Sequence, residues 1–371
     1  MSKQLKVTIL GYHGYGNGGD EAILLALRNN IEKINSEAKI TVLSFDPENT
    51  KKLYNVNAVP RFNMLSVAKE LMKTDILVAG GGTLIQDETS TRSLFYYLSV
   101  IYIAKIFGKK VMLYSNGVGP INIEKNKKYI RFVVNKVDVV TLRDEYSKAE
   151  LVALGIKESK LNVTADPAFS LTANKEIAES IFEKEKIAQD KPIIAVSLRK
   201  WDNDKEILDK VAKLCNHILE NRDVNILIIP MQYSFDMNIS RELYNKLDSE
   251  RTFLLEKPYL AEEILAIISK THMMISMRLH SLIFAGVLDV PLVGLVYDPK
   301  VRTYLELLDM ESLGDVKGLD EQNMIDVTNK VLDNISDYKN RLNKSTSILK
   351  EKAKETDIFL EKLVNNIQRN S

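Results

Sequence analysis

The chain has 371 residues, of which 45% are hydrophobic and 27% are charged. A globular chain of this length exceeds one ordinary core, so we expect two domains. Its 51 basic and 50 acidic residues leave a net charge of +1, which gives no electrostatic reason to expect a nucleic-acid partner. The single cysteine, Cys215, excludes an intrachain disulfide and a cysteine zinc site. No apolar signal segment precedes the first expected strand, which predicts a cytoplasmic protein.

Short apolar runs alternate with helical patterns along most of the chain, which is typical of parallel sheets with helices on both faces. The expected strands are 6–10, 40–45, 76–79, 111–115, 137–142, 162–165, 193–198, 225–230, 252–255 and the apolar runs that begin at Met273 and Leu292. We therefore predict an α/β fold with two Rossmann-like parallel-sheet domains facing a cleft. The predicted organisation is a first domain at 1–172, a linker at 173–190, a second domain at 191–330 and a helical tail at 331–371.

A glycine-rich loop follows the first expected strand. Gly14, Gly16 and Gly19 match the G-x-G-x-x-G pattern of dinucleotide-binding proteins, so such a site must be considered. Asp20 and Glu21 argue against it, because acidic side chains in the first helical turn repel a pyrophosphate. Two interpretations remain: a tight turn with an acidic helix start, or a loop whose polar side chains hold a polyhydroxyl ligand.

Two further loops bring the backbone close to the same predicted edge of the first sheet. One contains Gly81, Gly82 and Thr83, and the other contains Asn116. Glycines let a ligand approach the main chain closely, and successive N–H groups can bind anions or hydroxyls.

The aromatic segment 93–107 is too short and polar to span a membrane. It is interpreted as a helix packed on the sheet in preference to a helix on a membrane surface.

Cationic side chains follow several expected strands. Arg278 precedes a short helix that carries His280, and Arg143 stands at an equivalent strand end in the first half. Lys300 follows the next strand, and Arg199 ends the strand near 193. An arginine can hold a carboxylate or phosphate with two parallel hydrogen bonds, and a histidine can exchange protons near neutral pH. The alternative is structural, with Arg278 paired to a carboxylate and His280 capping its helix.

Taken together, these motifs resemble the polysaccharide pyruvyltransferase family. The resemblance rests on residues 17–22, 80–83, 116–120, 142–144, 166–167 and the Arg278-Leu279-His280 segment with Gly286, and it covers roughly residues 5 to 310. The chain looks most like the CsaB-type enzymes of secondary cell-wall polymer synthesis, which implies a role in S-layer anchoring. The resemblance also implies a glycosyltransferase-B-like fold. The implied reaction transfers the pyruvyl group of phosphoenolpyruvate to two sugar hydroxyls as a cyclic ketal, with N-acetylmannosamine as acceptor.

Roles for individual residues follow from this chemistry. Phosphoenolpyruvate carries a carboxylate and a phosphate, so we expect the second domain to bind it and several cations to surround it. His280 is the expected acid or base and His13 a poorer candidate. The expected donor-binding residues are Arg143, Arg199, Arg278 and Lys300, and the expected acceptor-binding residues are Asn17, Asp20, Gly81, Gly82, Thr83 and Asn116. No metal and no cofactor are expected.

Two other functions stay open at this point. A nucleotide-sugar glycosyltransferase is disfavoured because residues 281–295 lack the glutamate that many such enzymes use for the donor ribose. A noncatalytic sugar-binding protein is disfavoured because the arginine-histidine pair is present. An acceptor of the implied kind is carried on a lipid, so peripheral contact with the inner face of the membrane is expected. The basic run Lys125, Lys127, Lys128 and Arg131 can assist, although a solvated helix face explains it equally.

Overall fold

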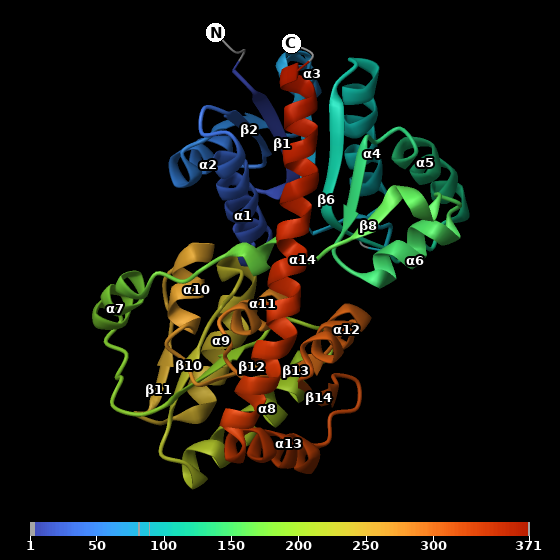
Figure 1. Cartoon of the computed structure of the whole chain (residues 1–371). Helices are drawn as coiled ribbons and strands as arrows, with labels where there is room; N and C mark the ends of the chain where they lie inside the picture. Colours follow the sequence, from blue (N-terminus) through green and yellow to red (C-terminus); the bar gives the residue numbers. More distant parts are fainter. Residues whose placement is uncertain (1–3, 81, 89, 370–371) are drawn as a thin grey trace. The chain divides into compact units, whose positions relative to one another are not determined.

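The computed structural model describes residues 4–80, 82–88 and 90–369. It divides into two compact units (Figure 1). Unit 1 comprises residues 4–15, 20–170 and 349–369, and unit 2 comprises residues 16–19 and 171–348. Each unit is built around its own parallel sheet.

Unit 1 contains an eight-stranded sheet among the described residues. Its strands follow the order β3-β2-β1-β4-β6-β7-β8, with β5 paired to the end of β6, and every pairing is parallel. The strands are β1 (Lys6–His13), β2 (Lys39–Ser44), β3 (Asn57–Pro60), β4 (Ile76–Gly80), β5 (Thr83–Ile85), β6 (Lys110–Val118), β7 (Val139–Leu142) and β8 (Leu161–Val163). The central strands are apolar on both sides, as a sheet covered on both faces requires.

Helices cover both faces of this sheet. Apolar side chains of α3, α4 and α5 form one core with β4, β6 and β7. The C-terminal half of α14 docks through buried polar contacts, including Ser115 Oγ to Thr356 Oγ1 at 2.8 Å. The helices are α1 (Gly18–Ile34), α2 (Pro47–Tyr54), α3 (Met64–Lys73), α4 (Thr91–Ile106), α5 (Glu124–Val134), α6 (Glu145–Ala153) and α14 (Ile335–Arg369), with short 3₁₀ turns at Glu158–Lys160 and Pro167–Ser170.

Unit 2 contains a six-stranded parallel sheet with the order β11-β10-β9-β12-β13-β14. Its strands are β9 (Ile193–Ser197), β10 (Asn225–Ile228), β11 (Thr252–Leu254), β12 (Met273–Ser276), β13 (Leu292–Val296) and β14 (Glu311–Asp315). Its helices are α7 (Lys175–Lys184), α8 (Asp204–Asn221), α9 (Tyr233–Leu247), α10 (Ala261–Ile268), α11 (Leu279–Val287), α12 (Pro299–Leu308) and α13 (Glu321–Asp333). The N-terminal part of α14, up to Ile348, also belongs to this unit.

Both sheets reverse their strand order at one point. In unit 1 the reversal lies between β1 and β4, and in unit 2 it lies between β9 and β12. In open α/β sheets, ligands bind at the carboxyl ends of the strands beside such a reversal. The loops after β1 and β4, and those after β9 and β12, are therefore where each unit is expected to bind a ligand.

The prediction of two Rossmann-like parallel sheets is confirmed. Three strands were missed because each is short and lacks an apolar run. β3 ends in a proline, β5 has only three residues, and β14 is partly exposed and contains two acidic residues. All three lie at the margin of a sheet or extend one strand, where fewer side chains are buried and the hydrophobic pattern is weak.

Candidate active site

Three predicted cations of unit 2 follow three neighbouring strands. Arg199 comes after β9, Arg278 after β12 and Lys300 after β13. Arg278 occupies the N-cap position of α11, and Lys300 lies in the first turn of α12 behind the capping side chain of Asp298. Helix amino termini add partial positive charge to the same edge. The carboxyl edge of this sheet therefore offers an anion both side-chain cations and free backbone donors.

Arg278 is held by groups that the sequence analysis did not select. Its Nη2 atom forms an ion pair with the buried carboxylate of Asp236 and donates to Gln232 Oε1 at 3.4 Å. The backbone N–H of Arg278 donates to Ser276 Oγ at 2.9 Å, which orients the start of α11. Among the described residues, the buried Nε atom has no hydrogen-bond partner. The arginine thus has a structural carboxylate on one side of its fork, and the hydrogen-bonding capacity of Nε is unused.

His280 lies in the first turn of α11 against the glycine loop. A Cβ added to Gly19 would lie 1.9 Å from Nδ1 of His280, so only glycine fits beside the ring. The neighbouring Gly18 donates its N–H to the carbonyl of Met231 at 3.2 Å. These contacts give the glycines a packing role in unit 2, which the dinucleotide interpretation did not anticipate.

Arg199 and Lys300 meet around one aromatic ring. The guanidinium carbon of Arg199 lies 4.7 Å from the ring centre of Tyr297, and Nζ of Lys300 lies 5.8 Å from the same centre. Trp201 packs edge-on against Tyr297 and also contacts Arg199. Lys300 pairs with Asp298 at 2.8 Å. The two cations therefore belong to one cluster, which Tyr297 and Trp201 hold together.

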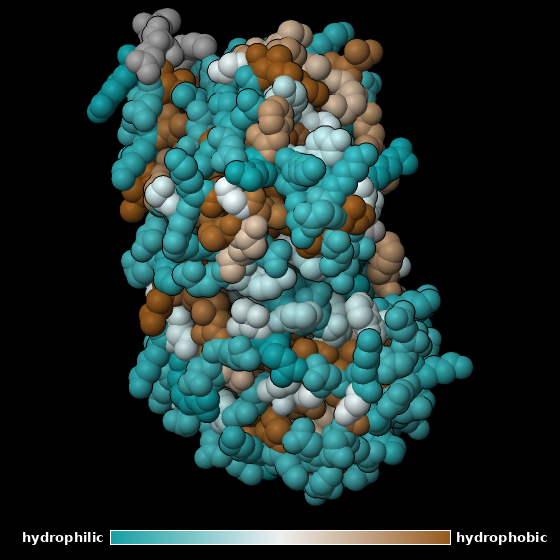
Figure 2. Space-filling model, turned by 90° about the vertical axis from the view of Figure 1, so that its right-hand side faces the viewer, coloured by the Kyte–Doolittle hydropathy of each residue, from teal (hydrophilic) through white to brown (hydrophobic). Residues whose placement is uncertain are grey.

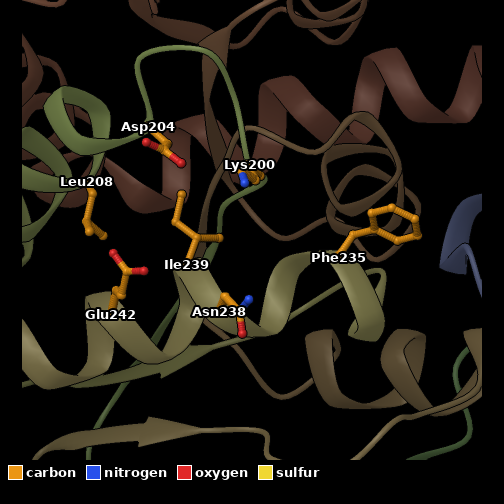
Figure 3. Close-up of a pocket in the computed structure, with 7 residues that line it drawn as sticks. All are labelled: Lys200, Asp204, Leu208, Phe235, Asn238, Ile239 and Glu242. Atoms are coloured by element: carbon orange, nitrogen blue, oxygen red, sulfur yellow. The ribbon is translucent and has the colours of Figure 1, made fainter.

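A separate small hollow of about 110 Å³ lies in unit 2, beside the segment that follows β9. Its lining comes from the segment after β9 and from α8 and α9. Figure 3 shows the carboxylates of Asp204 and Glu242 turned toward it, with Lys200 nearby. Two carboxylates would repel an anionic donor, so we do not include this hollow in the site.

Arg143 belongs to unit 1, where acidic groups surround it. Nε lies 3.2 Å from Asp144, Nη1 lies 3.7 Å from Asp166, and Nη2 donates to Thr83 at 3.1 Å. Only 5% of the side chain is exposed. Arg143 therefore joins the start of β5, the residue after β7 and the segment after β8 within unit 1. Its predicted contact with the donor stays a prediction.

Asp20 has the most unusual electrostatics at the carboxyl edge of unit 1. Burial raises its pKa to about 7, the carboxylates of Glu21 and Asp166 add to the rise, and the guanidinium groups of Arg143 and Arg61 oppose it. A Cβ on Gly82 would lie 2.9 Å from Oδ1 of Asp20, so the glycine leaves room for this carboxyl. A carboxyl group that titrates near neutral pH can accept or donate a proton during a reaction.

The remaining predicted acceptor residues differ in their accessibility. Asn116 is fully buried and donates to the carbonyl of Ala79 at 2.7 Å, so it links β6 to β4. Its direct contact with an acceptor stays a prediction that this burial does not favour. Asn17 accepts from the N–H of Gly19 at 3.1 Å, in the part of the loop that counts with unit 2. Gly81 lies outside the described residues.

His13, the second histidine candidate, is buried at the end of β1. Burial lowers its pKa to about 3, and the nearby positive charge of Arg61 lowers it further. The imidazole is therefore neutral near pH 7. A neutral imidazole does not supply a proton in that range, and the ranking of His13 below His280 stays a prediction.

Comparison with known families identifies the family to which this chain belongs. A family model described as polysaccharide pyruvyl transferase matches residues 17–299, which is more than half of the chain. The chain belongs to the polysaccharide pyruvyl transferase family. The matched range includes every predicted site residue except Lys300 and the poorer candidate His13. Membership in this family makes the protein a transferase enzyme of polysaccharide pyruvylation.

A curated relative also acts in polysaccharide synthesis. The amylovoran biosynthesis protein AmsJ of Erwinia amylovora is 21% identical over 397 residues, covering 91% of this chain and 94% of AmsJ. The family predicted from the sequence is thus confirmed, whereas the likeness to CsaB-type enzymes in particular stays a prediction.

Two solved structures show the same architecture. A putative UDP-N-acetylglucosamine 2-epimerase from Listeria monocytogenes superposes with a TM-score of 0.70 at 15% identity, covering 95% of this chain and 94% of the other. The UDP-GlcNAc 2-epimerase of Neisseria meningitidis bound to UDP-GlcNAc has a TM-score of 0.66 at 15% identity, covering 98% and 100%. These likenesses show the fold alone, which is of the glycosyltransferase-B type.

The candidate sites of the two units contain three features that the sequence analysis missed. Asp236 lies within α9, where a single aspartate on an amphipathic helix looks like an ordinary surface residue. Tyr297 and Trp201 were overlooked although both follow strand ends, which was the rule used to select the cations. Asp20 was selected as an acceptor contact, but its raised pKa depends on neighbours that only the folded chain brings close.

Within the described residues, no group of three or more His, Cys, Asp or Glu side chains is placed to hold a metal ion. A helix long and apolar enough to cross a membrane is likewise absent from residues 4–80, 82–88 and 90–369.

Proposed function

We propose that this pyruvyltransferase takes its pyruvyl group from phosphoenolpyruvate and transfers it to two hydroxyls of an acceptor sugar as a cyclic ketal, releasing phosphate. The proposed acceptor is N-acetylmannosamine in a lipid-linked precursor of a cell-wall polysaccharide, as CsaB-type enzymes imply. The observation that carries the donor assignment is the row of cations at the carboxyl edge of unit 2, after adjacent strands β9, β12 and β13.

The donor assignment follows from charge and geometry. Phosphoenolpyruvate is a small molecule with two anionic groups, and Arg199, Arg278 and Lys300 provide three cations on one sheet edge. The start of α11 adds backbone N–H groups to the same region. A bidentate arginine contact with the carboxylate, and lysine with the phosphate, satisfies both anionic groups of the donor.

The proton inventory of the reaction requires an acid and a base. The methylene carbon of phosphoenolpyruvate gains one proton and becomes a methyl group. The central carbon forms bonds to two oxygen atoms of the sugar, and its bond to the phosphate oxygen breaks. The two sugar hydroxyls each lose a proton, of which one balances the proton on the methyl carbon and the other leaves with phosphate. We assign protonation of the enol carbon to His280 in unit 2 and deprotonation of a sugar hydroxyl to Asp20 in unit 1.

The proposed lipid-linked acceptor brings the enzyme to a membrane surface, and one face of unit 1 supports such contact. Tyr129 and Phe132 on α5 are exposed beside Lys125, Lys128 and Arg131. Figure 2 shows apolar side chains gathered among polar ones over the upper part of the face that carries α4 and α5. Basic and aromatic side chains together favour peripheral contact with an anionic leaflet. Co-sedimentation with anionic and with zwitterionic vesicles tests this contact.

A single assay tests the proposed reaction. The purified chain is incubated with a lipid-linked N-acetylmannosaminyl saccharide and either phosphoenolpyruvate or a UDP-sugar. We expect phosphate release and a pyruvyl ketal on the sugar with phosphoenolpyruvate alone, detected by mass spectrometry and by the ketal methyl resonance. UDP release with the sugar nucleotide would instead assign a glycosyltransferase, and binding of the saccharide without turnover of either donor would assign a noncatalytic protein.

A further inference from the structure

An aromatic surface in unit 1 lies outside the roles assigned above. Tyr12 is the penultimate residue of β1 and Tyr15 follows the strand, and their ring centres are 4.0 Å apart with an angle of 5° between the ring planes. Phe45, directly after β2, continues the stack, because its ring centre lies 4.4 Å from that of Tyr15. We call these three rings the aromatic shelf. The shelf lies at the carboxyl edge of the sheet, where ligands bind.

The backbone around the shelf holds the rings in place. The N–H of Phe45 donates to the carbonyl of His13 at 3.0 Å, which joins the loop after β1 to the loop after β2. Gly14 adopts a φ of +82°, and an added Cβ would lie 2.2 Å from Oγ of Ser44. The close approach of the two loops therefore depends on glycine at this position.

A buried arginine holds the aromatic shelf in place. Arg61 is 3% exposed and donates to the carbonyl of Gly11 at 2.9 Å and to the hydroxyl of Tyr97 at 3.1 Å. Its guanidinium carbon lies 5.9 Å from the ring centre of Tyr12 and 5.6 Å from that of Tyr15. A surface held in this way loses little conformational entropy when a ligand binds to it.

The outer rings of the shelf face solvent. Tyr12 is 38% exposed and Phe45 is 55% exposed, although both belong to a well-packed stack. Tyr12 is also close enough to Asp20 for the carboxylate to raise the pKa of the phenol, in addition to the effect of burial. An exposed aromatic face next to a titratable carboxyl group is a suitable surface for a ring that is apolar on one side and carries hydroxyls at its rim.

We propose that the aromatic shelf binds a pyranose ring of the acceptor saccharide, with the C–H face of the sugar stacked on the exposed face of Phe45. This inference rests on the proposed function, because it places the acceptor in unit 1. Stacking covers the apolar face of the sugar and leaves its hydroxyls free to bind polar groups at the same edge of unit 1. The shelf then selects for a saccharide whose C–H groups form a continuous face, in addition to any selection made at the reacting hydroxyls.

The position of Phe45 allows a test that separates stacking from simple hydrophobic contact. Phe45→Leu keeps an apolar side chain without an aromatic face, Phe45→Ala removes the side chain, and Phe45→Tyr keeps the ring. We expect the acceptor KM to rise about 3- to 10-fold for the alanine and leucine variants and to stay near the wild-type value for tyrosine. The KM for phosphoenolpyruvate should not change in any of them.

Phe107→Ala provides a matched control, because Phe107 is an exposed phenylalanine of the same unit, 37% exposed at the C-terminal end of α4. With a soluble N-acetylmannosaminyl disaccharide as acceptor, this variant should behave as wild type. Circular dichroism and thermal unfolding of each variant confirm that it is folded. Wild-type acceptor KM in Phe45→Leu would overturn the proposal, because a surface for a lipid chain or a purely structural stack accepts leucine.

Saturation-transfer NMR gives a readout that does not depend on turnover. In the wild-type protein, the C–H protons of one sugar face should receive the strongest saturation, and Phe45→Leu should weaken this transfer selectively. Equal saturation of all sugar protons, unchanged in Phe45→Leu, would overturn the shelf. Absence of phosphate release from phosphoenolpyruvate in the wild type would refute the proposed donor instead, and the NMR result would still decide whether the shelf binds sugar.

Discussion

The candidate site residues of the two units occupy equivalent positions on their sheets but carry opposite charges. In each, the site residues follow strands beside the reversal of strand order. The edge of unit 2 carries Arg199, Arg278 and Lys300, whereas the edge of unit 1 carries Asp20, Glu21 and Asp166 near the buried arginines Arg61 and Arg143. The same fold thus presents a cationic edge in unit 2 and an acidic edge in unit 1.

This difference shows why the fold alone does not define the reaction. Solved epimerases share the architecture at about 15% identity, so the chemistry must come from side chains at the strand ends. By charge, the cations of the unit 2 edge suit the proposed anionic donor. A neutral sugar fits the unit 1 edge, because the aromatic shelf and Asp20 require no negative charge on the ligand.

The largest expected effect belongs to unit 2. His280→Gln keeps a hydrogen-bonding side chain of similar size but cannot exchange a proton, so kcat should fall by roughly 10²- to 10⁴-fold. Phosphoenolpyruvate should still bind with nearly wild-type affinity, as measured by calorimetry. Normal turnover in this variant would reduce His280 to a structural residue at the start of α11 and would shift the acid-base chemistry to unit 1.

Asp20→Asn tests the corresponding role in unit 1. We expect kcat to fall by roughly 10²-fold because the amide cannot accept a proton. In the wild type, kcat should rise with pH through about 7 as Asp20 ionises, and this rise should be absent from the residual activity of the variant. An unchanged pH profile would exclude Asp20 as the base.

The same substitution has an opposite effect on stability. The pKa of Asp20 is raised in the folded state, so the carboxyl stabilises the fold at low pH and this contribution is lost as pH rises through about 7. Asp20→Asn should therefore melt at a higher temperature than wild type at pH 8, by roughly 2–6 °C, with a smaller difference at pH 5. Lower stability at pH 8 would indicate that Asp20 is mainly structural.

The sequence was sufficient for the two sheets and for the side chains that follow strand ends, because apolar runs and loop positions are local properties. Arg278 and His280 were found in this way. Asp236 was not, because its pairing with Arg278 joins residues 42 positions apart and leaves no local pattern. Nor could the sequence show that the buried side-chain amide of Asn116 donates to the carbonyl of Ala79, since burial depends on the packed neighbours.

Arg278→Lys sharpens the assignment of the donor to unit 2. Lysine keeps the positive charge but loses the planar fork, so the KM for phosphoenolpyruvate should rise by roughly 10-fold while the acceptor KM stays constant. Arg341→Lys is the matched control, because Arg341 also pairs with an aspartate of unit 2, through Nε and Nη2 to Asp309 at 2.8 and 2.7 Å. Equal effects of the two substitutions would point to general loss of stability.

The smallest expected effect concerns the packing of the glycine loop. Gly19→Ala introduces a Cβ that would lie 1.9 Å from Nδ1 of His280, so the ring must shift and kcat should fall by roughly 3- to 10-fold. Gly318→Ala, where a Cβ meets no atom within 4 Å, should be neutral in the same assay. If Gly19→Ala is equally neutral, the position of His280 does not depend on the glycine loop.

Hydrogen exchange with one substrate at a time tests the division between the units most directly. Phosphoenolpyruvate alone should slow exchange in unit 2, at the segment from Met277 to Leu282 and at the start of α12, and should leave residues 11–15 of unit 1 unchanged. The acceptor saccharide alone should slow exchange at residues 11–15 and around Phe45. Protection of the unit 1 loops by phosphoenolpyruvate, with none at the start of α11, would contradict the account.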